Sequence, residues 1–172
     1  EVLDGVPCGW PGVPGSDVFD PMPGRLPSDL PTGAVESDPT ALEVLRIVAG
    51  VPAMGAEVTT DTIPAELGRW VIDASVSFTK GCYTGQELVA RIDSRGGNVP
   101  RNLRGVVGPV DPALTAGAPI EVDGRDVGVV TSAAVDEDRT VALGLVHRSV
   151  EPPTEATVAG VAARVLTLPL PL

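Results

Sequence analysis

Aromatic residues and histidine are scarce in this chain of 172 residues. Aromatic side chains make up 3% of the sequence, so the apolar share of 43% comes mostly from Val, Leu, Ile and Ala. A core of such residues suits β-strands better than packing around aromatic anchors. With one histidine, His147, and no cluster of Cys or His, the chain has too few ligands for a zinc site or an iron–sulfur cluster, and we expect no bound metal.

Cysteine and long apolar runs are also scarce. Cys8 and Cys82 are too few for a disulfide framework. Neither a signal peptide nor an apolar run near ~18 residues is present. We therefore expect a protein of the reducing cytoplasm that contacts no membrane. Because the opening stretch after Glu1 reads as the middle of a longer protein, we also expect a truncated chain.

The chain has an excess of acidic residues, with a formal charge of −11. This charge repels nucleic acid and anionic membranes at long range, so we expect no direct contact with nucleic acid. Locally the balance is reversed, with five basic residues and two acidic ones, or +3, between Lys80 and Arg104. This segment suits a small anionic ligand, and it equally suits an ordinary solvated helix followed by a basic loop.

The first hundred residues carry the signals of loops and short helices. Dense Pro and Gly over residues 1–40 predict loops and short pieces. Asp38 as an N-cap, Pro39 in the first turn and Gly50 as a terminator predict a helix over 39–49. A second, brief helical turn is expected over 62–67, with Pro64 at its start.

A further helix is expected directly after Cys82. Thr84 and Glu87 match the capping-box pattern, and apolar residues recur four apart after them. Gly96-Gly97-Asn98 ends this helix and opens a linker. We place a domain boundary near residue 101, which gives domains over 1–100 and 101–172.

The second domain is predicted to be rich in β-structure. Strands are expected over 103–110, 119–122, 127–131, 140–146 and 157–167, and Asp123-Gly124 is a strong hairpin signal. Five or six strands in ~70 residues favour a small antiparallel barrel or sandwich, because closure hides the strand edges.

Cys82 is the residue most suited to covalent or redox chemistry. It precedes the expected helix and follows Lys80, the chain's single lysine, by two residues. Helix N–H groups and a nearby ammonium both favour a thiolate. A lone cysteine is, however, usually a small buried hydrophobe, and no histidine lies near it in sequence, although folding could bring His147 close.

The residues around Cys82 suit an ordinary structural role as well as a functional one. Gly81 and Gly85 allow an anion or a planar ring to approach the backbone, and they also suit a simple tight turn. Gln86, Glu87 and Arg91 share one helical surface, on which Glu87 and Arg91 form a common i,i+4 ion pair.

Together these residues make up a longer pattern, Lys-Gly-Cys-Tyr-x-Gly-Gln-Glu-x-x-x-Arg, from Lys80 to Arg91. The pattern resembles the signature of the YgfZ family of folate-binding proteins, relatives of the glycine-cleavage T-protein. The stretches that contain Leu45-Arg46-Ile47, Gly55-x-Glu57 and Ile63-Pro64-x-Glu66, and the later strands at Gly128–Ser132 and Ala142–Val146, are similar to the same family. The resemblance covers residues 41–167 and is weaker before residue 41.

The resemblance implies an α+β fold, in which the end of a T-protein-like central α/β domain precedes a small antiparallel β-barrel. It implies tetrahydrofolate as cofactor, iron–sulfur proteins as clients, and support of iron–sulfur cluster assembly or repair and of iron–sulfur-dependent tRNA modification. It also assigns a functional part to Cys82, whose chemistry stays open between a redox-sensitive thiol, a transient attachment point and a partner contact.

Within this resemblance, Glu66 matches a carboxylate expected to contact the pterin ring through two parallel hydrogen bonds. Alternatively, Glu66 has only a structural role, in which its negative charge interacts favourably with the start of a helix. The chain lacks most of the N-terminal half that the family uses for its folate site. Three alternatives remain: aminomethyl transfer as in the T-protein, a docking module for iron–sulfur proteins without chemistry of its own, and a small β-domain without a special site.

Overall fold

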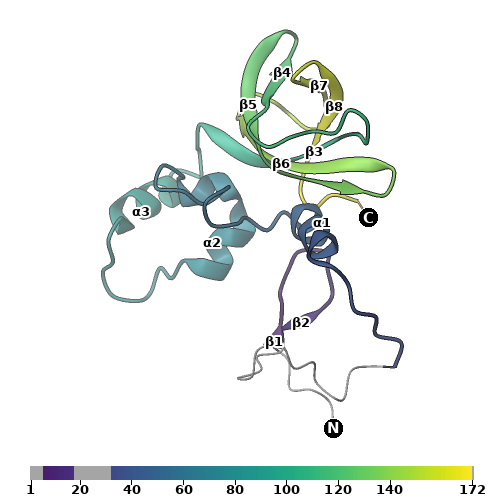
Figure 1. Ribbon diagram of the computed structural model, residues 1–172. Coiled ribbons are helices and arrows are strands. Elements are labelled where there is room, and N and C mark those ends of the chain that lie inside the picture. The colour runs from purple at the N-terminus through teal and green to yellow at the C-terminus, as the bar shows by residue number, and fades with distance from the viewer. Residues whose placement is uncertain (1–5, 18–31, 172) are drawn as a thin grey trace.

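The computed structural model describes residues 6–17 and 32–171. Figure 1 shows a β-barrel, with α2 and α3 beside it, α1 against it, and the β1–β2 hairpin farthest from it. The elements are β1 (Val6–Pro7), β2 (Ser16–Asp17), α1 (Pro39–Ala49), the 3-10 turn η1 (Pro64–Leu67), α2 (Arg69–Ser75), α3 (Gln86–Ser94), β3 (Arg101–Pro109), β4 (Pro119–Val122), β5 (Arg125–Asp136), β6 (Arg139–His147), β7 (Thr154–Val158) and β8 (Val161–Leu166). The loops expected over 1–5 and 18–31 lie outside the described residues. The predicted α+β class is confirmed.

The barrel is closed and its strands are antiparallel, in the order β3-β6-β5-β4-β7-β8. Closure is made where Gly105 of β3 pairs with Leu166 of β8. Because every strand has two neighbours, no open edge is left for unwanted pairing. The small antiparallel barrel predicted from the strand count is therefore confirmed.

Two turns decide the strand boundaries. Asp123 and Gly124 adopt positive φ values of 51° and 71° between β4 and β5, as a two-residue hairpin of this type requires, so that prediction is confirmed. The single strand expected over 157–167 is wrong. Ala159 and Gly160 also adopt positive φ, 48° and 84°, and split this stretch into the β7–β8 hairpin. Alanine carries no turn signal, which is why the apolar run looked continuous.

The barrel interior is filled by aliphatic side chains, as the composition predicts. Val106, Ile120 and Val165 are fully buried there. Each such side chain contributes about 1.5–3 kcal/mol through burial. Gly144 lets two strands approach, since a Cβ there would lie 2.7 Å from Ile120 Cδ1 and 3.0 Å from the carbonyl oxygen of Val129.

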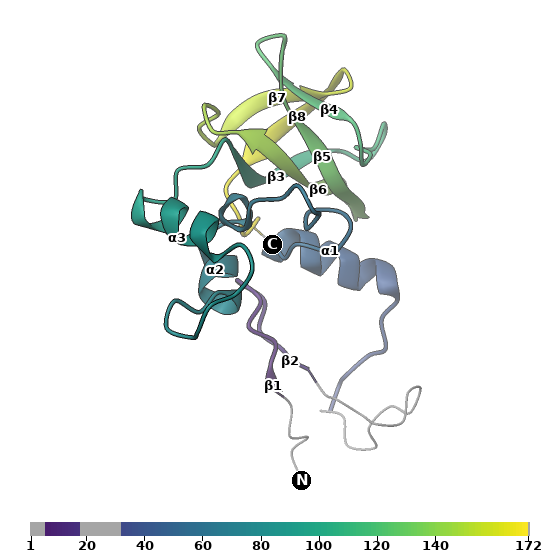
Figure 2. The same ribbon diagram turned by 90° about the vertical axis from the view of Figure 1, so that its left-hand side faces the viewer.

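A second apolar cluster joins the outside of the barrel to α1. Ile47 and Val48 of α1 pack with Leu143 of β6 and with Leu170 near the C-terminus. The amide of Leu170 donates to the carbonyl of Val48 at 2.8 Å. Figure 2 shows α1 lying under the barrel close to the C-terminus, as in Figure 1.

α1 forms as its sequence predicts, over residues 39–49. The side chain of Asp38 accepts a hydrogen bond from the amide of Ala41 at 3.0 Å, and Gly50 ends the helix with φ 75°. The backbone hydrogen bonds from Ala41 and Thr40 hold the pKa of Asp38 below its usual value. The brief turn expected near Pro64 is also present, as η1.

The capping box expected at Thr84 is wrong. The N-cap of α3 is Gly85, in the left-handed conformation with φ 84°, and no side chain caps the helix. Because Gly85 occupies the cap, Thr84 and Glu87 each lie one position away from the places a capping box requires. α3 consequently begins at Gln86, one residue later than a Thr84 cap would place it, so the helix expected after Cys82 is present, and none of its residues is buried. α2 was not predicted.

Candidate functional site

The segment between α2 and α3 carries the cysteine motif on an open loop. Ser77 Oγ accepts hydrogen bonds from the amides of Thr79 and Lys80, at 3.4 and 3.1 Å, which shape the start of the loop. The Lys80 ammonium then lies over the ring of Tyr83, 5.0 Å from its centroid. Such a cation–π contact contributes about 0.5–1 kcal/mol at an exposed position.

Most of the motif lines one open hollow, here called the motif hollow. Its volume is about 750 Å³, and its walls are Cys82, Tyr83, Gly85, Gln86, Glu87, Leu88, Ala90 and Arg91. Six of the eight motif residues predicted from sequence therefore lie together, since only Lys80 and Gly81 are not part of the wall. Gly85 fits the predicted tight turn because its φ is positive.

The thiol of Cys82 is open to solvent. Cys82 is exposed, whereas Cys8 is half-buried. The Lys80 ammonium is engaged by the Tyr83 ring, and His147 Nδ1 lies 2.8 Å from Ser149 Oγ and is not part of the wall of the motif hollow. Activation of Cys82 by either group thus stays a prediction, while its accessibility follows from the structure.

Glu87 and Arg91 do not form the ion pair suggested by their spacing. No salt bridge joins them in the described part of the chain, and both side chains are exposed. Exposed pairs of this kind gain little, because water screens them. The cation of Arg91 is thus available at the edge of the motif hollow.

Glu66 is held by an arginine rather than presented to a cavity. Its side chain has no exposed surface, and Arg101 donates to both oxygens, at 2.9 and 3.0 Å, while the amide of Ile63 donates to Oε2 at 3.2 Å. The pairing raises the pKa of Arg101 above its usual value. Both oxygens of this carboxylate are thus engaged by Arg101, and a pterin ring would compete with Arg101 for them. The cofactor role of Glu66 stays a prediction.

A separate cavity of about 470 Å³ lies beside η1, between α2, α3 and the start of β3. Ile63, Pro64 and Ala65 line it, but Glu66 does not. On its rim Arg69 Nη1 is bonded to Asp93 at 3.1 Å, which joins α2 to α3.

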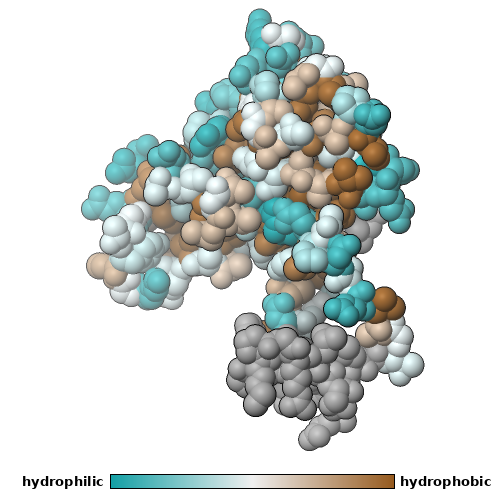
Figure 3. Space-filling view, viewed as in Figure 1, coloured by the Kyte–Doolittle hydropathy of each residue, from teal (hydrophilic) through white to brown (hydrophobic). Residues whose placement is uncertain are grey.

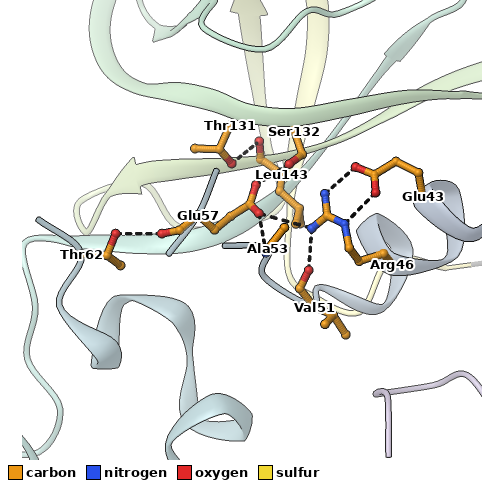
Figure 4. Close-up of polar contacts among 9 residues, drawn as sticks. All are labelled: Glu43, Arg46, Val51, Ala53, Glu57, Thr62, Thr131, Ser132 and Leu143. Carbon is orange, nitrogen blue, oxygen red and sulfur yellow. Dashed lines mark hydrogen bonds and ion pairs between the residues drawn. The ribbon is translucent and has the colours of Figure 1, made fainter. Parts of the chain in front are cut away.

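A second buried carboxylate, Glu57, was not predicted as a key residue. Glu57 is fully buried, and its oxygens accept hydrogen bonds from Ser132 Oγ at 2.6 Å, the Ala53 amide at 2.9 Å and Arg46 Nη1 at 3.2 Å (Figure 4). The ladder between β5 and β6 is irregular next to Ser132, and such a bulge re-aims a side chain. Glu57 therefore fastens α1 and the loop after it to the barrel.

Arg46 completes this cluster. It also donates to Glu43 at 2.6 and 2.8 Å and to the carbonyl of Val51 at 2.6 Å. The hydrogen bond to Glu43, together with the charges of Glu57 and Glu43, raises the pKa of Arg46, and the hydrogen bond from Arg46 lowers the pKa of Glu43. Arg46 and Glu57 are eleven residues apart, and α1 ends at Ala49, so no single helix carries both and no local pattern predicted the pair.

Residues 6–17 and 32–171 contain no group of three or more His, Cys, Asp or Glu side chains placed to hold a metal ion. Among the same residues, no helix is long and apolar enough to cross a membrane.

Fold and site together define an α+β protein in which a closed six-stranded barrel carries a helical segment with an exposed cysteine motif. No protein-family model matches the chain. The chain is 39% identical over 101 residues to the tRNA-modifying protein YgfZ of Yersinia pestis, an alignment that covers 56% of the chain and 30% of the relative.

Two further relatives match shorter fractions of their own length. A chloroplastic protein of Arabidopsis thaliana, named as a candidate transferase, is 38% identical over 105 residues, or 60% of the chain and 22% of the relative. An uncharacterized protein of Haemophilus influenzae is 41% identical over 71 residues, or 41% of the chain and 25% of the relative. The chain thus spans less than a third of the length of each relative. The similarity to a protein named YgfZ agrees with the resemblance read from the motif.

Proposed function

We propose that this chain is part of a cytoplasmic, tetrahydrofolate-binding protein that supports iron–sulfur enzymes, including those that modify tRNA. Its similarity to relatives named tRNA-modifying protein YgfZ supports the tRNA part of this proposal. The folate and iron–sulfur parts rest on the motif resemblance from Lys80 to Arg91.

The observation that carries the proposal is the shared wall of the motif hollow. Six motif residues surround one open space, and the thiol of Cys82 is exposed in it. A thiol that served only as packing would be buried, as free cysteines commonly are. The arrangement therefore supports a functional thiol that meets a ligand or partner from solvent.

The carboxylate that the resemblance assigns to tetrahydrofolate is paired with Arg101 in this structure. Glu66 is closed off by Arg101, so we expect the ligand to be held mainly by the remainder of the longer protein. Calorimetric titration of tetrahydrofolate tests this expectation. We expect binding to a version extended by its upstream sequence and much weaker binding to the 172-residue chain; no binding to either version would remove folate from the proposal.

The role of Cys82 is tested by two substitutions in the extended protein. Cys82→Ala and Cys82→Ser should each abolish support of a tRNA-modifying iron–sulfur enzyme in a bacterial strain that lacks its own relative. The fold should survive, because an exposed loop residue contributes little packing. Cys8→Ser is the matched control, since it removes the other thiol and should leave support intact. Full support by both Cys82 variants would refute a functional thiol.

A further inference from the structure

The outer face of α3 is open, unlike the face of α1 that meets the barrel. α1 buries Ile47, Val48 and Ala49, whereas no residue of α3 is buried and 46% of the Leu88 side chain is exposed. Figure 3 shows apolar and hydrophilic residues intermixed on the surface of the helices beside the barrel. Apolar side chains left open on a helix are a common feature of docking surfaces.

The charges on this face are positive. Arg91 follows Leu88 by three residues, so these two side chains share one face of α3, and Arg95 is the C-cap at the end of the same helix. Neither arginine has a carboxylate partner within 4.0 Å among the described residues, and Lys80 lies in the adjoining loop. Of the acidic residues of α3, Asp93 is paired with Arg69, so Glu87 is the one that remains to offset the positive charges. The face is thus cationic on a chain whose net charge is −11.

We propose that the outer face of α3 and the motif hollow form a docking surface for an acidic protein segment that carries an apolar side chain. This inference rests on the proposed function, because an iron–sulfur client would supply the segment. The apolar side chain sits in the motif hollow against Leu88 and Tyr83. Carboxylates to one side of it pair with Arg91 and Arg95.

Charge complementarity favours such a segment over other occupants. A cationic patch attracts an acidic partner and suppresses basic ones. The acidic remainder of the chain repels a long polyanion such as RNA more strongly than a short acidic peptide, because more charges interact over a longer distance. The motif hollow adds an apolar contact that RNA phosphates would not use. Docking there also brings the client next to the Cys82 thiol.

Fluorescence anisotropy with two labelled peptides tests the docking surface on the 172-residue chain. One peptide alternates Glu and Asp with a central Leu-Phe pair, and its matched control replaces each acid with Lys. We expect the acidic peptide to bind at least tenfold more tightly than the basic one, with an affinity that falls as salt is added. Equal binding of both peptides, or no binding of the acidic one, would overturn the inference.

Substitutions then locate the binding site. Arg91→Glu with Arg95→Glu should weaken the acidic peptide at least tenfold, and Leu88→Ser should weaken it several-fold. The matched control is Arg125→Glu with Arg164→Glu, which changes the net charge equally at exposed positions on the barrel and should have little effect. Equal losses in both double variants, or tighter binding of a single-stranded RNA oligonucleotide at the same face, would contradict a protein-docking site.

The docking surface and the proposed function fail in different ways. Peptide binding to the unchanged chain tests the docking surface, whereas support of the iron–sulfur enzyme by Cys82→Ser tests the thiol, so the two readouts are separate. If the unchanged chain does not bind the peptide but Cys82→Ser loses support of the enzyme, the docking surface is refuted and the functional thiol is not. Specific peptide binding together with full support by Cys82→Ser would refute the functional thiol and leave a docking module.

Discussion

The barrel and the segment that carries the cysteine motif are stabilised in different ways. The barrel strands enclose a core of fully buried aliphatic side chains and leave no open edge. The motif loop and α3 bury no residue between Lys80 and Ser94. Local stability follows the number of buried contacts, so the barrel should open last and the motif segment first. A firm scaffold carrying an accessible site is a common division of labour in proteins.

Two buried glutamates connect these parts. Glu57 binds Ser132 of β5, and Glu66 binds Arg101 of β3, so each fastens the chain before the motif to a barrel strand. Glu57 also meets Arg46, whose side chain is 11% exposed, whereas 40% of the Arg101 side chain is exposed. Removal of the arginine partner should therefore lower the free energy of unfolding more at Glu57 than at Glu66.

The largest predicted effect is on the Glu57 cluster. Arg46→Ala leaves the fully buried Glu57 carboxylate without its cation, and it should lower the free energy of unfolding by about 3–5 kcal/mol. Urea denaturation measures the change. Arg164→Ala is the control, because it breaks only an exposed pair with Glu155 and should cost less than about 1 kcal/mol. Similar losses in both variants would show that the cluster does not fasten α1 to the barrel.

Substitution of two glycines by alanine should show a smaller difference in stability. Gly144→Ala places a Cβ against Ile120 and the backbone of Val129, so it should destabilise the barrel by about 1–3 kcal/mol. Gly81→Ala meets no atom within 4 Å, and Gly81 does not have a positive φ, so the same change in the motif should leave the melting temperature nearly unchanged. A large loss from Gly81→Ala would mean that the motif loop is packed rather than open.

The smallest contrast is between two predicted helix caps. Asp38 caps α1, so Asp38→Ala should lower the melting temperature by about 2–4 °C. Thr84 does not cap α3, and Thr84→Ala should have no measurable effect on it. Thermal unfolding followed by circular dichroism compares the two. A larger decrease in melting temperature from Thr84→Ala than from Asp38→Ala would show that Thr84, and not Gly85, caps α3.

These contrasts also show which features the sequence could predict. Asp38, Pro39 and Gly50 act within one turn of α1, and Asp123-Gly124 acts within one hairpin, so local rules predicted both correctly. At Thr84 two local signals competed, and the left-handed conformation of Gly85 prevailed over the side-chain cap. The Ala159-Gly160 turn carried only the signal of Gly160, because alanine rarely adopts the positive φ that Ala159 has here.

In the candidate site, too, contacts between residues near in sequence were predictable and contacts between distant residues were not. The motif residues lie near one another because they are close in sequence, so their clustering in one hollow was predictable. The partners of the two glutamates were not, because Arg101 lies 35 residues from Glu66 and Ser132 lies 75 residues from Glu57. Only tertiary packing brings such pairs together.

The central claim, that the motif thiol is open on a folded barrel, is tested most directly by the alkylation rates of the two cysteines in native protein. Iodoacetamide labelling followed by peptide mass spectrometry separates Cys82 from half-buried Cys8. We predict that Cys82 is labelled severalfold faster, at a rate that changes little as urea unfolds first the motif segment and then the barrel. Protection of Cys82 until global unfolding, with Cys8 labelled first, would contradict the account.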